Sequence, residues 1–323
     1  MKKIILITGA AGMVGSNLIN KYINQDVQII AIDSLKLGKM EYIKFFKKKK
    51  NFLFFKKDLS KKIKDRKIEN ILKQNYLHEV WHLAANSDIQ SGISDYEVDL
   101  KDTFLTTFNT LNFINKYLKK NTKLIFSSSS AIYGYVKGSI SENYKKKNPI
   151  SNYGLMKLLS EEYIEYFANK NNLKTYIFRF PNVIGNNLTH GIIYDFIKKI
   201  SYNKKILNVL GNGDQQKPYS DVLEIIKCMI FIKNKKFLQN VNFFNIGTND
   251  KGIKVRDIVD IFLKATNYGT KAIFQRKKQG WVGDVVNYRY STKKINKLGF
   301  RFKLSSKQVI TKTIKESIKI NIK

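Results

Sequence analysis

Short apolar runs alternate along the chain with longer segments in which apolar residues recur at helical spacing. Runs typical of strands cover residues 4–7, 27–32, 51–57, 78–83 and 123–130, and helical patterns cover 63–76, 98–118 and the segment after 153. Strands that alternate with helices predict an α/β fold with a doubly wound parallel sheet. In such a sheet, ligands bind at the carboxyl ends of the strands.

The first strand leads into a turn that contains Gly9, Gly12 and Gly15. Glycines let the backbone turn tightly and approach a pyrophosphate, and a following helix points its first N–H groups at that charge. Met13 and Val14 lie where this helix is expected to begin. Three glycines alone would also suit a plain flexible turn, but a strand on each side of the turn predicts a Rossmann dinucleotide site.

Two acidic residues at strand ends bear on the choice of cofactor. Asp33 ends the second strand 18 residues after Gly15, a spacing that suits the carboxylate that accepts ribose hydroxyls. A carboxylate there repels a 2′-phosphate, so the sequence predicts NAD rather than NADP. Asp58, after the third strand, has two interpretations of equal weight: it accepts the adenine amino group, or it caps the next helix.

Two later strands also end in small and polar residues. Residues 82–87 read His-Leu-Ala-Ala-Asn-Ser, and these small side chains leave room for the backbone of a cofactor. His82 is interpreted as a structural histidine. The next strand ends in four serines, 127–130, which offer hydroxyls to a ligand but would also suit a polar loop.

Tyr153 and Lys157 follow the serine run and lie four residues apart. The apolar residues that recur at helical spacing around them are Leu155, Leu158, Leu159 and Tyr166. This pattern predicts an amphipathic helix that carries Tyr153 and Lys157 on one face. Because an ammonium group favours the phenolate, Lys157 is expected to lower the pKa of Tyr153, which suits a general base. Tyr-x-x-x-Lys alone often occurs by chance, so it supports a catalytic role only together with the motifs that precede it.

The 323 residues carry a net charge of +34, which raises the question of a nucleic-acid partner. Lysines occur in small groups along the whole chain, so we interpret them as side chains on solvent-exposed surfaces. A nucleic-acid partner is not favoured. No apolar segment is long enough to span a bilayer. Cys228, the single cysteine, lies in an apolar stretch, which predicts a core position, excludes an internal disulfide and favours a cytoplasmic location.

Taken together, the motifs resemble those of the extended short-chain dehydrogenase/reductases. Within that family they are most similar to the NAD-dependent nucleotide-sugar epimerases and dehydratases of the UDP-glucose 4-epimerase type. The resemblance covers nearly the whole chain. It rests on Thr8-Gly9-x-x-Gly12-x-x-Gly15, Asp33, Asp58-Leu59, His82-Leu83-Ala84-Ala85, 127–134 (Ser-Ser-Ser-Ser-Ala-Ile-Tyr-Gly), Tyr153-x-x-x-Lys157 and 179–185 (Arg-Phe-Pro-Asn-Val-Ile-Gly).

This resemblance implies a role for individual residues. The implied NAD-binding residues are Gly9, Gly12, Met13, Val14, Gly15, Asp33, Asp58, Leu59, Leu83, Ala84, Ala85, Tyr153 and Lys157. The implied catalytic residues are Tyr153, Lys157 and Ser129, which lies four residues before Tyr133 of a Tyr-Gly pair. The implied substrate contacts are Ser87, Ser129, Asn182 and Lys217.

Two departures from the family pattern bear on the reaction and on phosphate binding. Ser130 and Ala131 stand where dehydrating relatives carry an Asp-Glu pair, which disfavours elimination and favours epimerisation. Lys217, within the segment 207–220 that is expected to form a hairpin, takes the place of an arginine. Lysine keeps the charge but gives up bidentate geometry.

Two more departures concern the end of the chain and the helix after 98. Gly283-Asp284 resembles the second half of an Arg-Pro-Gly-Asp motif that the family carries late in the chain. Trp281 and Val282 stand in place of its Arg-Pro. The alternatives for the missing charge are Arg276, Lys277 and Lys278. Thr103 stands where many family members have an asparagine.

The predicted activity is NAD-dependent epimerisation at C4 of a UDP-hexose through a transient 4-keto sugar. Tyr153 takes the hydroxyl proton, Ser129 holds that oxygen, Lys157 binds the nicotinamide ribose, and NAD accepts and returns the hydride. One alternative is a nucleotide-sugar oxidoreductase, such as a 4-keto-sugar reductase, on the same scaffold. Another is a basic RNA-binding protein that keeps the NAD fold.

The expected organisation is an NAD-binding Rossmann domain over residues 1–180 and a smaller α/β domain for the nucleotide sugar over most of 181–323. A strand near 241–247 is expected to return to the first sheet. The tail 305–308, Ser-Ser-Lys-Gln, has a capping-box pattern that predicts a terminal helix. The resemblance also implies a homodimer formed by helices of the first domain.

Overall fold

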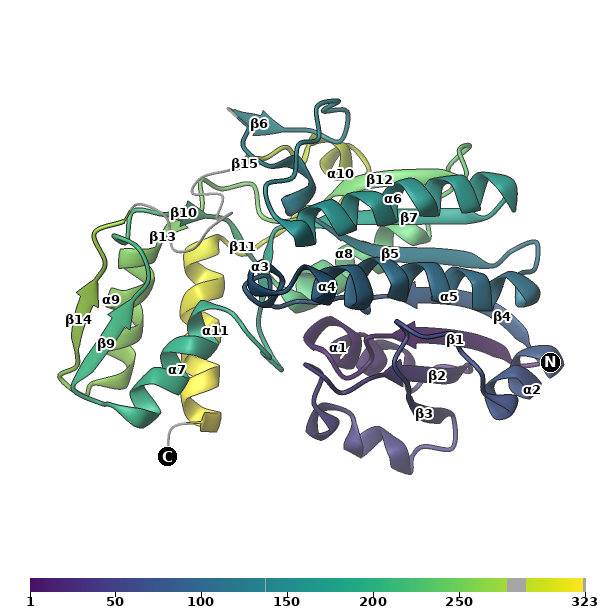
Figure 1. Cartoon of the computed structure of the whole chain (residues 1–323), viewed down its shortest axis with the longest axis horizontal. Coiled ribbons are helices and arrows are strands. Elements are labelled where there is room, and N and C mark those ends of the chain that lie inside the picture. The colour runs from purple at the N-terminus through teal and green to yellow at the C-terminus, as the bar shows by residue number, and fades with distance from the viewer. Residues whose placement is uncertain (137, 278–288, 322–323) are drawn as a thin grey trace.

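The computed structural model describes residues 1–136, 138–277 and 289–321 (Figure 1). Its centre is a parallel sheet of seven strands in the order β12-β7-β5-β4-β1-β2-β3, which confirms the predicted fold class. The strands are β1 (Lys3–Thr8), β2 (Gln28–Asp33), β3 (Phe52–Lys56), β4 (Tyr76–His82), β5 (Lys123–Ser129), β7 (Lys174–Phe180) and β12 (Val241–Asn245). The strand order reverses between β1 and β4, so the crevice for a ligand is expected at that point.

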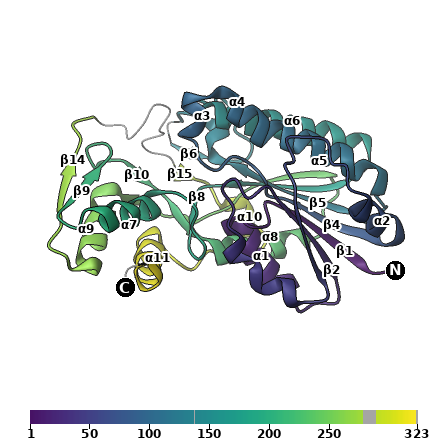
Figure 2. The same cartoon turned by 60° about the horizontal axis from the view of Figure 1, so that its bottom comes forward.

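Helices cover both faces of this sheet (Figure 2). One face carries α2 (Arg66–Gln74), α5 (Thr106–Ile114) and α6 (Asn152–Lys170). The other face carries α1 (Met13–Tyr22), α8 (Val222–Lys233) and α10 (Lys293–Lys297). The strands between these layers are apolar on both sides, as the continuous burial of Ile4, Ile5, Leu6 and Ile7 shows.

A second, smaller unit lies beside the sheet, at the left of Figure 1. It consists of α7 (Ile192–Tyr202), α9 (Val255–Thr266) and α11 (Ser306–Asn321) around a core of their own, with the pair β9 (Ile206–Val209) and β14 (Lys271–Phe274). The chain leaves the large sheet after β7 and returns to it for α8, β12 and α10. The second half of the sequence therefore contributes to both units.

The remaining elements are short. Three two-stranded pairs are β8 (Asn182–Ile184) with β11 (Tyr219–Asp221), β10 (Gln216–Lys217) with β13 (Ile253–Lys254), and β6 (Ser139–Ile140) with β15 (Arg289–Tyr290). The helical turns are η1 (Met40–Tyr42), η2 (Lys44–Lys48), α3 (Ser91–Ser94), α4 (Tyr96–Asp99), the π-helical η3 (Leu100–Leu105), η4 (Asn115–Tyr117) and η5 (Ser130–Tyr133). In the described part of the chain, no helix combines the length and the apolar character that a membrane span requires.

The expected hairpin over residues 207–220 is wrong. β9 pairs with β14, and β10 pairs with β13, so the two strands of that segment do not pair with each other. The sequence between them does form a tight turn, in which Gly211 and Gly213 have positive φ. Turn residues alone did not reveal the partners because both strands pair with segments far away in the sequence.

The helix around Tyr153 is confirmed, but its inward face is not the predicted one. Leu155, Leu159 and Tyr166 are 41%, 40% and 62% exposed. The buried face instead contains polar residues, among them Lys157 and Glu161, which are 2% and 1% exposed. The apolar residues used for the prediction therefore lie largely on the outer face of α6, whereas Met156, Ile164 and Phe167 lie on its buried face.

The predicted terminal helix is confirmed as α11. The backbone N–H of Ser305 donates to Oε1 of Gln308 at 2.9 Å, and the backbone N–H of Gln308 donates to the Ser305 hydroxyl at 3.3 Å. These two bonds are the reciprocal pair of a capping box. Ile310 and Ile314 are fully buried in the core of the smaller unit. Cys228 is buried in the core of the larger unit, also as predicted.

We expect Gly15→Ala to destabilise the fold. A Cβ at Gly15 would lie 2.7 Å from Cα of Ala10 and would also overlap the carbonyl oxygen of Gly9, and neither backbone atom has room to move. Overpacking of this kind costs about 1–3 kcal/mol. Urea unfolding of the purified variants measures the effect.

Gly12→Ala is the matched control, since its Cβ would lie 3.3 Å from the same carbonyl oxygen. We expect this variant to lose less stability than Gly15→Ala. Equal losses in the two variants would contradict the packing argument.

Candidate active site

A cavity lies at the carboxyl end of the sheet, across the point where β1 and β4 adjoin. It has two adjoining parts of about 250 and about 170 Å³, which share Met13, Val14, Leu83, Ala85, Asn86, Ser87 and His190. One part contains all the cofactor residues predicted around the glycine turn, namely Gly9, Gly12, Met13, Val14, Gly15, Asp33, Asp58, Leu59, Leu83, Ala84 and Ala85. The other contains Ser87, Ser129, Tyr153, Lys157, Asn182 and Lys217. The structure thus brings every predicted site residue to one cavity.

The glycine turn has the geometry of a cradle for a dinucleotide. Gly9 has a φ of 66°, and a Cβ there would lie 2.7 Å from the backbone nitrogen of Ala84, so only glycine lets β1 approach β4 so closely. Helix α1 begins at Met13 directly after this turn, and no side chain caps its first N–H groups in the described structure. Free N–H groups at a helix start are suited to a pyrophosphate, so the cradle fits NAD.

Asp33 lies at the end of β2 with its carboxylate turned to this cradle. Its two oxygens accept the backbone N–H groups of Ala11 at 2.9 Å and of Leu35 at 2.7 Å. Burial raises the pKa of Asp33, and these two hydrogen bonds oppose the rise. The bonds hold the carboxylate in place and leave further lone pairs for ribose hydroxyls.

Asp58 does not cap the next helix, because Asp65 is the cap of α2. Its Oδ1 accepts the backbone N–H and the hydroxyl of Ser60, at 3.0 and 2.7 Å, and its Oδ2 lies 3.5 Å from Nζ of Lys36. Burial opposes ionisation of Asp58, but the bonds from Ser60 and the charge of Lys36 outweigh it and lower the pKa. The first of the two interpretations, contact with adenine, remains a prediction.

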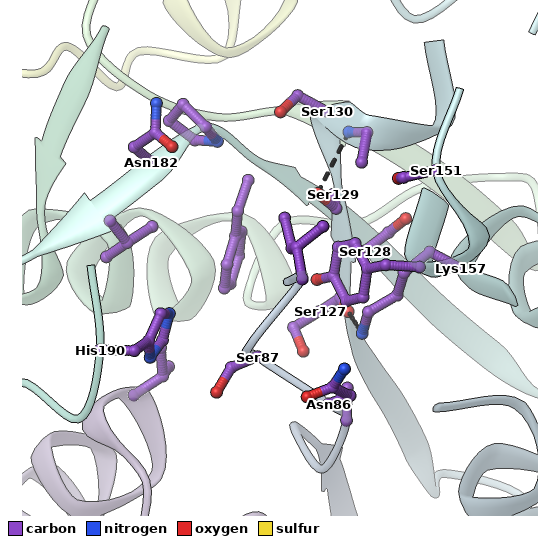
Figure 3. Close-up of a pocket in the computed structure, with 18 of the residues that line it drawn as sticks. Asn86, Ser87, Ser127, Ser128, Ser129, Ser130, Ser151, Lys157, Asn182 and His190 are labelled. Carbon is purple, nitrogen blue, oxygen red and sulfur yellow. Dashed lines mark hydrogen bonds between the residues drawn. The ribbon is translucent and has the colours of Figure 1, made fainter. Parts of the chain in front are cut away.

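Ser129, Tyr153 and Lys157 converge on the second part of the cavity. Ser129 ends β5, and its Oγ accepts the backbone N–H of Ala131 at 3.1 Å and hydrogen-bonds with Tyr153. Lys157 donates from Nζ to the backbone carbonyl of Ser127 at 2.6 Å (Figure 3). The resulting cluster of a hydroxyl, a phenol and an ammonium group is able to hold a sugar oxygen and accept its proton.

The expected effect of Lys157 on Tyr153 is not found. Burial raises the pKa of Tyr153 to about 12, although the bond with Ser129 opposes the rise. Burial also lowers the pKa of Lys157 to about 7, against the attraction of Glu161. Nζ of Lys157 lies 5.9 Å from the centre of the Tyr153 ring. The pKa of Tyr153 is therefore set by burial, the bond with Ser129 and the charge of Asp99.

The sequence interpretation missed a buried network behind these residues. Glu161 accepts two bonds from Arg179, at 2.9 and 2.7 Å, and one from the hydroxyl of Ser128 at 2.5 Å. Arg179 also donates to the hydroxyl of Tyr133 at 2.7 Å. The available signal is spacing, because Glu161 lies four residues after Lys157 and thus on the same face of α6.

The residues predicted for substrate come from separate elements. Ser87 follows β4, Asn182 begins β8, and Lys217 ends β10. Nδ2 of Asn182 donates to the carbonyl of Pro218 at 3.2 Å, which connects β8 to the segment after Lys217. Ser130 and Ala131 also line this part of the cavity.

Only some of the residues that could supply the charge of the arginine replaced by Trp281 lie in the described part of the chain. Trp281, Val282, Gly283, Asp284 and Lys278 lie outside the described residues. Arg276 and Lys277 are described, and neither lines the cavity.

His82 has the structural role expected of it. It is fully buried, and its ring nitrogens bond the hydroxyls of Thr8 at 2.8 Å and Thr107 at 3.0 Å. Burial, together with the charge of Lys157, lowers the pKa of His82 to about 3, so its ring is neutral at neutral pH.

The sequence model of the NAD dependent epimerase/dehydratase family matches residues 5–247, which include the glycine turn, the serine run, Tyr153 and Lys157. The chain belongs to this family. The prediction of NAD as cofactor is thereby confirmed. That NAD binds along the cradle described above remains a prediction. The roles of individual residues in binding and catalysis remain predictions.

Individual relatives agree with this assignment. The chain is 28% identical to a putative UDP-glucose 4-epimerase of Methanocaldococcus jannaschii, over 96% of this chain and 97% of the relative. It is 26% identical to a dTDP-4-dehydro-6-deoxyglucose reductase of Escherichia coli, over 76% and 77%. The solved structure of UDP-glucose 4-epimerase from Thermotoga maritima with UDP-glucose matches with a TM-score of 0.83 and 27% identity, over 98% of this chain and 99% of that one. The chain is an enzyme of the nucleotide-sugar epimerase/dehydratase type.

Asp99 is a second buried group that acts on Tyr153. It is 1% exposed, its Oδ1 accepts a bond from Asn86 at 2.8 Å, and its Oδ2 is buried without a hydrogen-bond partner among the described residues. Its negative charge contributes to the raised pKa of Tyr153 after the larger effect of burial. Asn86 lines the cavity, so Asp99 also holds part of the cavity wall.

We expect Asp99→Asn to lower the pKa of Tyr153, because removal of a nearby negative charge favours the phenolate. The measurement is a pH titration of tyrosine ¹³Cζ signals by NMR, with the Tyr153 signal assigned by its loss in Tyr153→Phe. Asp102→Asn is the matched control, since Asp102 lies three residues away and is paired with Lys36 at 2.6 Å. An equal shift in both variants, or none in Asp99→Asn, would show that Asp99 does not act specifically on Tyr153.

Proposed function

We propose that this enzyme epimerises a nucleotide-activated hexose at C4, with UDP-sugars as the substrate class. The observation that carries the proposal is the composition of the cavity wall. Ser129, Tyr153 and Lys157 face the substrate part, and no carboxylate among the described residues lines that part. Dehydration needs a further group to move a second proton, whereas epimerisation needs one base and a reversible hydride acceptor.

The residues have distinct roles in this proposal. NAD supplies the reversible hydride acceptor when it is bound along the glycine turn. Tyr153, in its phenolate form, accepts the proton of the C4 hydroxyl, and Ser129 holds that oxygen through its hydroxyl. Lys157, fixed by the carbonyl of Ser127, binds the nicotinamide ribose. Asn182 and Lys217 bind the diphosphate of the substrate.

The names of the relatives support epimerisation and define its rival. The relatives from M. jannaschii and T. maritima are named for 4-epimerisation of UDP-glucose. The E. coli relative is named as a reductase, and a 4-keto-sugar reductase on this scaffold is the second candidate. The two differ in what happens to the cofactor, because an epimerase regenerates it and a reductase consumes it.

The deciding experiment incubates the purified enzyme, without added cofactor, with UDP-glucose, UDP-galactose, UDP-glucuronic acid, UDP-arabinose and dTDP-glucose in separate reactions. Chromatographic separation of the products identifies the epimer formed. We expect interconversion of one epimer pair without net change in absorbance at 340 nm. Turnover of a 4-keto sugar only with stoichiometric NADH consumption would establish the reductase instead.

We expect Tyr153→Phe to lower the epimerisation rate about 10²–10⁴-fold, because it removes the group that accepts the proton. The rate is measured with the sugar nucleotide identified in the panel, and bound NAD is measured after release from the protein. Tyr166→Phe is the matched control, since Tyr166 lies on the same helix and is 62% exposed. Full activity of Tyr153→Phe would overturn the assignment of the base.

The outer face of α6 is the proposed interface of a homodimer. Leu155, Leu159 and Tyr166 are exposed on this helix, and Tyr96 and Leu100 are 73% and 41% exposed on the neighbouring segment that packs against it. Neighbouring exposed apolar side chains of this size are typical of an association surface. A second copy of the chain is the proposed occupant because α6 belongs to the larger unit, where the resemblance implies dimer contacts.

We expect the double substitution Leu155→Glu, Leu159→Glu to convert a dimer into a monomer, because it places charges in an apolar contact. Light scattering coupled to gel filtration gives the mass. Tyr202→Glu on α7 is the control, since Tyr202 is 90% exposed and lies on the smaller unit. A monomeric unaltered protein would contradict the proposed dimer.

A further inference from the structure

His190 lies where the two parts of the cavity meet, and the proposed chemistry gives it no role. It lines both parts, as do Met13 and Val14 from the start of α1, whereas Asn182 and Lys217 line the substrate part alone. Figure 3 shows it across the cavity from Ser129 and Lys157, so it faces the ligands from the side opposite the reacting groups. A ligand group at this junction therefore contacts His190 without contacting Tyr153.

The hydrogen bonding of His190 leaves one ring nitrogen for a ligand. Its Nδ1 lies 2.9 Å from the hydroxyl oxygen of Thr189. Burial lowers the pKa of His190, although the charge of Asp88 opposes this shift. The lowered pKa favours the neutral ring at neutral pH. A neutral imidazole has one donor and one acceptor, and we assign the donor to Nε2 with the Thr189 hydroxyl donating to Nδ1. His190 then offers an N–H group to the cavity.

The basic side chains that line the substrate part suit an anionic ligand, although the carboxylate of Asp88 also acts on His190. Among the described residues that line the substrate part, the basic side chains are Lys157, Lys217 and His190, and Nζ of Lys157 already donates to the carbonyl of Ser127. Helix α7 begins at Ile192, two residues after His190, and no side chain caps it within the described structure. Its first N–H groups thus lie close in sequence to the imidazole and are suited to an anion, although its first turn also carries the carboxylate of Asp195.

We propose that His190 donates a hydrogen bond from Nε2 to a diphosphate oxygen at the junction of the two parts of the cavity. This inference rests on the proposed function, because it takes a nucleotide diphosphate to be the ligand. Two diphosphates have this chemistry, that of NAD and that of the sugar nucleotide. Lys217 supplies charge at the same ligand, and Thr189 acts as a positioning residue that fixes the tautomer of the ring.

The test compares His190→Ala, His190→Gln and Thr189→Val with the unaltered enzyme. Calorimetry measures the Kd of UDP or dTDP, whichever binds the unaltered enzyme more tightly, and of the matching monophosphate. Bound NAD is quantified after purification, and KM and kcat are measured with the sugar nucleotide. His78→Gln is the matched control, because His78 lies at the amino end of β4, away from the cavity.

We expect His190→Ala to weaken nucleoside diphosphate binding about 10-fold or more, since a hydrogen bond to a charged group is lost. Monophosphate binding changes less, KM rises with the Kd, and kcat stays within about threefold. His190→Gln, which keeps an N–H donor, restores part of the affinity, and Thr189→Val loses an intermediate amount. A structural role of His190 would not separate the diphosphate from the monophosphate in this way.

The outcomes distinguish the two ligands and the two hypotheses. Loss of bound NAD with unchanged diphosphate affinity assigns the contact to the cofactor and still supports the proposal. Unchanged NAD content and unchanged diphosphate affinity in His190→Ala would overturn it. If His190→Ala does not fold, the same comparison is made with His190→Gln and Thr189→Val, and unchanged values in both would also overturn it. Because binding and NAD content need no turnover, failure of epimerisation in the unaltered enzyme leaves this test intact.

Discussion

The active site depends on the buried ion pair between Glu161 and Arg179. Both side chains are 1% exposed, and the guanidinium donates two bonds to the carboxylate at 2.9 and 2.7 Å. This pair joins α6 to the end of β7, and the bond from Ser128 to Glu161 joins it to β5. Because Tyr153, Lys157 and Glu161 follow one another at intervals of four residues, fixing Glu161 fixes the rotation of the whole helix face.

The pair also connects the site to the second half of the chain. Arg179 donates to the hydroxyl of Tyr133, which donates in turn to Oδ1 of Asn245 at the end of β12. Loss of one partner of a buried pair costs about 3–5 kcal/mol because the other charge is left without compensation. The return of the chain to the large sheet thus completes the support of the face of α6 that carries Tyr153 and Lys157, in addition to extending the sheet.

The strands, the glycine turn and the capping box of α11 were predictable because each is specified by residues close in sequence. The inward face of α6 was not, because its buried positions include Lys157, Ser160 and Glu161, whose burial is made favourable by distant partners such as Arg179. The hairpin over 207–220 failed for a related reason, since strand pairing is set by long-range contacts. The candidate site was predictable as a set of residues, whereas the protonation of Tyr153 and Lys157 depends on burial that a sequence does not show.

The arrangement of charge in the cavity explains why a net charge of +34 says little about the ligand. The part around the glycine turn has the carboxylates of Asp33, Asp58 and Asp102, together with Lys36 and Lys57. Carboxylates suit hydroxyl and amino donors such as those of an adenosine. The substrate part has basic groups and, among the described residues, no carboxylate. This difference between the two ends of one cavity suits a ligand that carries donors at one end and phosphates further along. Lysines distributed over the exterior raise the concentration of anions near the protein, but they do not orient any of them.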